Sequence, residues 1–194
     1  MTNDVWRSRG QAHGGYEVIK NISFAVALSG LSMLFVSSIS AKAAWLKVEP
    51  PDGGFSVFFP ATPTATTKES SGTLTRIWTA RAGNLQCLIG MTDYNGHLDA
   101  EQELELDMKN FLKAVNASLQ SQERLSFRAA PDGPLPGLKF GFAKTGLTGQ
   151  SVVVVSGDRS YQAVAIVSDG PYAKDASRCL DFKITSQSRH WQGH

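Results

Sequence analysis

The chain has 194 residues, with 19 Lys and Arg against 17 Asp and Glu. Residues 1–43 hold four of the basic and two of the acidic side chains, so the remainder carries 15 of each and is close to neutral. A neutral chain lacks the basic patch that attracts nucleic acid or an anionic membrane surface, and we expect neither as a partner. The length after residue 43 suits a single domain with one substantial core.

The N-terminal residues have the pattern of an export signal. A weakly positive leader precedes the apolar run ISFAVALSGLSMLFVSSI, and Ala41 and Ala43 then form the A-x-A pattern that a signal peptidase cleaves. We predict that residues 1–43 are a cleaved signal peptide, with cleavage between Ala43 and Ala44. The alternative is an uncleaved anchor, because the run approaches the roughly 18 residues of a spanning helix. Serines and a glycine dilute the run, which favours cleavage and a periplasmic or secreted protein that touches a membrane only through a retained signal segment.

Strands and turns dominate the next segment. We expect a short strand over 45–49, a turn at PPDGG, and a second strand, FSVFF, over 55–59 that ends at Pro60. In that strand Phe55, Val57 and Phe59 share the core face, because successive side chains alternate. Residues 61–72 are polar, and we expect a loop there. Segments 73–81 and 85–94 predict a hairpin around Gly83-Asn84.

A helix is predicted over about 100–119. Apolar residues recur at spacings of four, three, four and four, which makes one buried stripe: Leu104, Met108, Phe111, Val115 and Leu119. Asp99 and Gln102 have the spacing of a capping box, and Glu105 and Lys109 form an i,i+4 pair.

Four more strands are expected, over 124–129, 137–146, 150–157 and 160–168, with turns at LTGQ and GDRS that make the last three an antiparallel meander. Pro171 opens a second, shorter helix. The side chains on one side of that helix are Tyr172, Ala176, Cys179 and Leu180. The strand DFKIT then closes the fold, and residues 187–194 form a loose tail.

Taken together, these elements predict one α+β domain over 44–186, a mostly antiparallel sheet covered by two helices. Four strands, a helix, four strands and a helix do not alternate as a nucleotide-binding doubly wound fold does.

The two cysteines are predicted on inward faces, Cys87 on a strand and Cys179 on the second helix. A disulfide between them fits an oxidising compartment if that helix crosses that strand. The alternative is two small buried residues that never meet.

Signs of catalysis are few. The chain has no G-x-S-x-G, H-E-x-x-H, Walker or dinucleotide-binding motif, and His97 is the one histidine between residue 44 and the tail. We therefore lean against an enzyme and expect no catalytic residue, no cofactor and no metal ligand.

Three groups of polar or aromatic residues are candidate sites. On a helix only i,i+4 pairs share a face, so we interpret the acidic run as a solvated first turn. Its members are Glu101, Glu103, Glu105 and Asp107. His190 and His194 could hold a metal only if the tail were helical. Trp78 and Tyr94 could line a groove, although single exposed aromatic residues are common.

Three stretches carry a resemblance to known proteins: PPDGGFSVFFPATP, YQAVAIV after a Gly-Asp turn, and ASRCLDFKIT. They resemble a class of exported bacterial domains of unknown function that is similar in fold to the PsbP/Mog group, over residues 45–186. The resemblance implies an antiparallel sheet covered by helices and non-enzymatic accessory or binding work. It carries over no catalytic residues. Members often end the last helix with Phe-Leu-x-Ser-Phe, where this chain has Cys179-Leu180-Asp181-Phe182.

We therefore expect an exported, non-enzymatic binding or accessory module of the bacterial cell envelope, with an envelope protein as its partner. A periplasmic carrier of a small apolar ligand is the alternative, and a hydrolase is the third hypothesis. A roomy polar-lined cavity would favour the carrier, and an exposed apolar patch a protein partner.

Overall fold

The computed structural model describes residues 45–70, 72–129, 133–170 and 174–185. The predicted signal peptide, with Ala43 and Ala44, lies outside these residues, and so do Pro171, Tyr172 and the tail with its two histidines. No helix among the described residues is long and apolar enough to cross a membrane.

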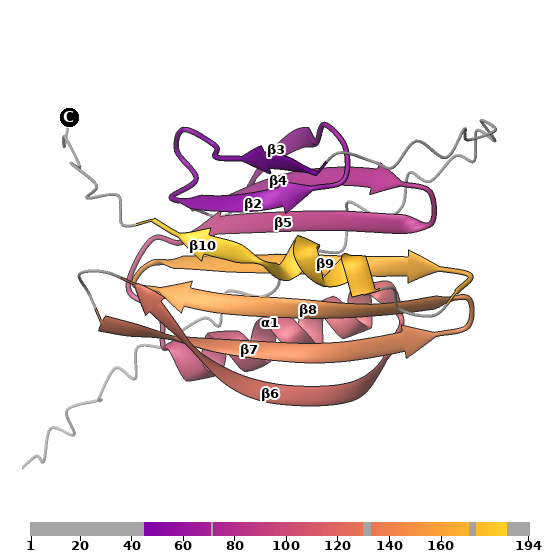
Figure 1. Ribbon diagram of the computed structural model, residues 1–194. Coiled ribbons are helices and arrows are strands. Elements are labelled where there is room, and N and C mark those ends of the chain that lie inside the picture. The colour runs from indigo at the N-terminus through magenta and orange to yellow at the C-terminus, as the bar shows by residue number, and fades with distance from the viewer. Residues whose placement is uncertain (1–44, 71, 130–132, 171–173, 186–194) are drawn as a thin grey trace, which may run out of the picture.

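Two antiparallel sheets and two helices form three layers (Figure 1). The large sheet has the order β3-β4-β5-β9-β8-β7-β6, and the small sheet has the order β1-β2-β10. The strands are β1 (Leu46–Val48), β2 (Phe55–Phe59), β3 (Thr64–Ser70), β4 (Thr73–Ala82), β5 (Leu85–Asp93), β6 (Ser118–Ala129), β7 (Gly133–Lys144), β8 (Leu147–Ser156), β9 (Arg159–Ser168) and β10 (Phe182–Ile184). The helices are α1 (Ala100–Val115) and the 3-10 helix η2 (Lys174–Leu180). The predicted α+β class, a mostly antiparallel sheet covered by two helices, is confirmed.

Helix α1 covers one face of the large sheet, over β7 and β8. Phe111 packs edge-on against Phe140 and Phe142, with ring centroids 5.8 and 4.9 Å apart. These rings occupy the space between α1 and the sheet. The buried stripe of α1 is the predicted one up to Val115.

Helix η2 and the small sheet cover the opposite face. Phe55, Val57 and Phe59 of β2 point into this second core, as predicted, together with Cys87, Ile89 and Met91 of β5. The central strands of the large sheet, such as β5 and β9, are therefore buried on both faces, each face by its own layer.

Several predicted strand and turn boundaries were wrong. Residues 64–70, expected in a loop, form β3, which pairs with β4 from Thr64 opposite Thr79 to Ser70 opposite Thr73. Five strands, not four, therefore precede α1. The strand expected from residue 124 begins at Ser118, and LTGQ belongs to β8 rather than to a turn.

The helix also ends earlier than predicted. Asp99 caps α1 by accepting a hydrogen bond from the Gln102 amide at 3.1 Å, but Asn116 adopts a left-handed conformation (φ 51°) and stops the helix. Leu119 consequently lies in β6, where it is exposed. Glu105 does not pair with Lys109; it accepts hydrogen bonds from Arg124 at 2.8 Å and Gln122 at 3.1 Å.

Candidate functional site

The candidate site lies on the outer surface of the small sheet and η2. In β2 the inward direction of Phe55, Val57 and Phe59 turns Phe58 outward, where it lies opposite Lys47 of β1. Phe58 is half-buried, and Lys47 is exposed. An aromatic ring is thus held at the surface by strand alternation alone.

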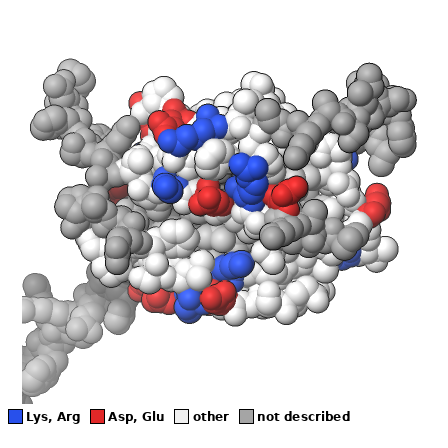
Figure 2. Space-filling model, in the orientation of Figure 1, with Lys and Arg blue, Asp and Glu red and all other residues white. Residues whose placement is uncertain are grey.

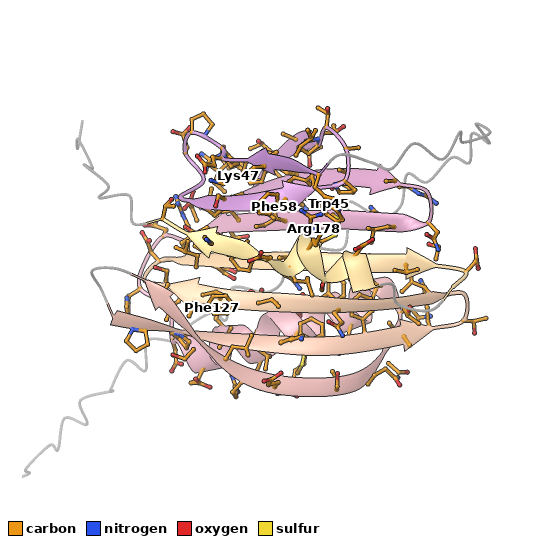
Figure 3. The ribbon with its side chains drawn as sticks, viewed as in Figure 1. Trp45, Lys47, Phe58, Phe127 and Arg178 are labelled. Atoms are coloured by element: carbon orange, nitrogen blue, oxygen red, sulfur yellow. A yellow bond between two sulfur atoms is a disulfide. The ribbon has the colours of Figure 1, made fainter. Side chains whose placement is uncertain are left out.

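Arg178 reaches this ring from η2. Ala176 and Cys179 of η2 are buried against the large sheet, which leaves Arg178 exposed on the outer side. Its guanidinium carbon lies over the ring of Trp45, 4.7 Å from the centroid, and over that of Phe58, 5.7 Å from the centroid. We call Trp45, Phe58 and Arg178 the aromatic–arginine cluster (Figure 3).

The chemistry of this cluster suits recognition. A cation over an aromatic face at a partly exposed site is worth about 0.5–1 kcal/mol, which favours one orientation of a long side chain. Within the described part of the chain, no ion pair or side-chain hydrogen bond involves Arg178. With respect to the described residues, its N–H groups therefore have donor capacity left for a partner.

Charges of both signs surround the cluster. Figure 2 shows acidic and basic side chains interspersed on this face rather than gathered by sign. Lys47 forms an ion pair with Glu49, and Asp175 and Asp181 lie three residues to either side of Arg178 in sequence. The surface is aromatic and charged without being basic as a whole.

A disulfide and a network of charged hydrogen bonds hold the cluster on the large sheet. The disulfide joins Cys87 of β5 to Cys179, the residue next to Arg178, with the Cα atoms 5.4 Å apart. Both predicted cysteines are therefore brought together, and η2 cannot leave the sheet while the bond is intact.

A network of charged hydrogen bonds holds the turn before β2. Asp93 accepts hydrogen bonds from Arg76 at 3.1 Å and Arg159 at 2.5 Å, and Arg159 also donates to the Gly53 carbonyl at 3.3 Å. Burial lowers the pKa of Arg159, but hydrogen bonds to Tyr161 and Asp93 outweigh this, so its pKa is raised. The small sheet is thus anchored at its turn as well as through η2.

A polar cluster under α1 is the other candidate. Ser160 of β9, a buried side chain, donates to the Asp107 carboxylate at 2.6 Å, and Tyr94 donates to Glu103. Burial, and then the charge of Glu103, raise the pKa of Asp107 to about 7, although the Ser160 hydrogen bond lowers it. Burial, and then the charges of Asp107 and Glu103, raise the pKa of Tyr94.

This cluster corrects one prediction and joins α1 to the sheet. The acidic run is not a uniformly solvated turn: Glu101 and Glu105 pair with Arg124, whereas Glu103 and Asp107 turn inward. Only i,i+4 members share a face, as expected. Its groups bond one another, so the arrangement fastens α1 to β9 and to Tyr94, the residue that follows β5.

The other residues weighed from sequence lie apart from one another. His97 is exposed in the loop before α1, and within the described residues no hydrogen bond joins it to a serine or cysteine. Trp78 is half-buried and packs edge-on against Phe55, with centroids 5.2 Å apart. The described residues contain no group of three His, Cys, Asp or Glu that could hold a metal.

Sequence reasoning missed the aromatic–arginine cluster. The signals were present, because the face shared by Ala176 and Cys179 implies that Arg178 points away from it. Phe127 lies elsewhere on the same side of the molecule (Figure 3), where its ring packs against Phe182 at 5.6 Å. It belongs to the core rather than to the cluster.

The architecture defines a PsbP-like α+β fold. It is similar to the solution structure of cyanobacterial PsbP (CyanoP) from Synechocystis sp. PCC 6803, with a TM-score of 0.50 and 10% identity over 78% of this chain and 98% of that chain. A crystal structure from Bacteroides thetaiotaomicron VPI-5482 matches with a TM-score of 0.37 and 14% identity over 73% of this chain and 48% of that chain. No protein-family model and no curated protein matches the sequence. The resemblance to the PsbP group expected from sequence is confirmed at the level of the fold.

Proposed function

We propose that this protein is an exported, non-enzymatic accessory module of the bacterial cell envelope that binds another protein through the aromatic–arginine cluster. The observation that carries the proposal is the exposed Arg178 held over Trp45 and Phe58. Trp and Arg are enriched among the residues that dominate binding energy at protein interfaces, and aromatic residues are enriched at interface centres.

Two further features support a rigid binding module. The cluster rests on a layer fixed by a disulfide and by the Asp93 network, so little order has to be gained on binding. A disulfide is typical of proteins that fold in an oxidising compartment, which agrees with the predicted signal peptide and a periplasmic or secreted location.

The carrier hypothesis has less support. The space between α1 and the sheet is occupied by Phe111, Phe140 and Phe142, which pack against one another. A carrier needs room for its ligand there. A protein partner needs only the surface that Trp45 and its neighbours present.

Site-specific photo-cross-linking in the producing bacterium tests the proposal. The photoreactive amino acid p-benzoyl-phenylalanine replaces Lys47, which lies opposite Phe58, or Leu106, which is 43% exposed on α1 at the other side of the large sheet. We expect the probe at position 47 to cross-link one envelope protein and the probe at position 106 to give no such product.

Two outcomes would contradict this proposal. A protein that stays in the cytoplasm with residues 1–43 attached would remove the export claim. Equal cross-linking from positions 47 and 106 would remove the claim that the cluster is the binding surface.

A further inference from the structure

We infer that the group bound by Arg178 is a single carboxylate of the protein partner, with an apolar residue beside it on Trp45 and Phe58. This inference rests on the proposed function and names the chemistry that the partner must present. It starts from the position of the guanidinium over two aromatic rings.

A planar guanidinium has two faces and a rim of N–H donors. The guanidinium carbon of Arg178 lies 4.7 Å from the ring centroid of Trp45 and 5.7 Å from that of Phe58, so the cation rests against two aromatic rings. The edges of the rings and their apolar faces offer no oxygen to the N–H groups, which therefore need another acceptor. Their fork spacing matches the two oxygens of a carboxylate, and a lysine ammonium offers neither this fork nor the stacking.

The chain itself supplies no such carboxylate in the described structure. Asp175 and Asp181 lie on either side of Arg178 in sequence, but neither forms an ion pair with it in the described residues. The neighbouring cation Lys47 is already paired with Glu49. Arg178 therefore differs from Lys47 in having its charge available.

Charge complementarity indicates a protein rather than a membrane or a nucleic acid. Acidic side chains are interspersed with the basic ones on this face (Figure 2), and they would repel a dense array of phosphates. Membranes and nucleic acids attract clusters of basic residues without such acids. A single carboxylate flanked by apolar atoms fits an arginine that lies beside two rings and has no ion pair with any described residue.

The test is a titration of the purified 15N-labelled protein followed by NMR. The probes are acetyl-Gly-Leu-Glu-Leu-Gly-amide and its twin with Gln in place of Glu, which differ only in the carboxylate. We expect the Nε–H signal of Arg178 and the indole N–H signal of Trp45 to shift with the Glu peptide. The Gln peptide should bind about tenfold more weakly, because its amide cannot accept the two charge-assisted hydrogen bonds that a carboxylate accepts from arginine.

Three variants distinguish the paired hydrogen bonds of the guanidinium from the effect of its charge alone and from a general effect of changing a surface arginine. Arg178→Gln should lose the preference for the Glu peptide, and Arg178→Lys should keep only a small part of it, because lysine keeps the charge without the fork. Arg81→Gln is the matched control, since Arg81 is an exposed arginine whose side chain donates to the Gly83 carbonyl. It should bind both peptides as the unaltered protein does.

The inference is overturned if the two peptides bind equally, if neither shifts the Arg178 signal, or if Arg178→Lys binds as tightly as the unaltered protein. It is also overturned if vesicles of phosphatidylglycerol shift the Arg178 signal and the Glu peptide does not. The peptides need no envelope partner, so cross-linking at position 47 together with equal peptide binding would leave the proposed function standing and reject the carboxylate.

Discussion

Breaking the Cys87–Cys179 disulfide should destabilise the protein by an amount that its loop length sets. The two residues are 92 positions apart. In the chain-entropy relation, closing a loop of that length removes about 16 cal/mol/K from the unfolded chain, or about 4.6 kcal/mol at 25 °C. A domain of this size loses about 2–4 °C in Tm per kcal/mol, so the Tm should fall by roughly 9–18 °C.

Denaturant unfolding of Cys87→Ala, Cys179→Ala and the double variant measures this effect. Each single change removes the same bond, so the double variant should lose about as much free energy of unfolding as either single variant, not their sum. Reductant should destabilise the unaltered protein by a similar amount and leave the double variant unchanged. A loss below about 1 kcal/mol, or additive losses, would refute the argument from loop closure.

Three other changes test the packing and capping of α1 and the packing of the large sheet beneath it. The pKa of Asp107 is raised from 3.8 to about 7 in the folded protein. Between these pH values the folded state keeps the proton and the unfolded state loses it. The free energy of unfolding should therefore fall as the pH rises through that window. Asp107→Asn should flatten this slope in unfolding curves at pH 5 and pH 8, and an unchanged slope would contradict the assignment. Gly149→Ala should cost about 1–3 kcal/mol in denaturant unfolding, because the added Cβ would lie 2.4 Å from the Phe142 ring and 2.7 Å from the Ala165 carbonyl oxygen; a neutral change would mean that the ring moves aside. Asp99→Ala should cost about 1 kcal/mol by the same measurement through loss of the helix cap, and Asp99→Asn, which keeps an accepting oxygen, should cost less.

Local patterns predicted the interior well. Alternation in β2 placed Phe55 and Phe58 on opposite faces, and the spacing from Leu104 to Val115 gave the buried stripe of α1. These patterns succeed because the period of the backbone decides which side chains meet the core. The same alternation predicted that Cys87 points inward.

The errors come from tertiary pairing. β3 has no apolar face and is exposed along most of its length, so its threonines looked like a loop until β4 supplied the hydrogen bonds of an edge strand. Leu119 continues the helical spacing by coincidence, after Asn116 has already turned the chain.

The site was harder to predict than the core. Trp45 precedes β1, Phe58 lies in β2 and Arg178 lies in η2. They meet where β2 pairs with β1 and β10 and where the disulfide holds η2 on β5. Such a contact between distant segments has no local signature in a single sequence. Strand and helix faces could have shown which of these side chains point outward, but not that they meet.

The most direct test of the account is the yield of the position-47 cross-link when Trp45→Ala and Arg178→Gln are introduced together. Both side chains lie on the outer layer, so a thermal unfolding curve should confirm that the variant remains folded. We predict that the cross-link to the envelope protein is lost while the variant is exported normally. A cross-link of undiminished yield from a folded, exported variant would show that the aromatic–arginine cluster is not the binding surface.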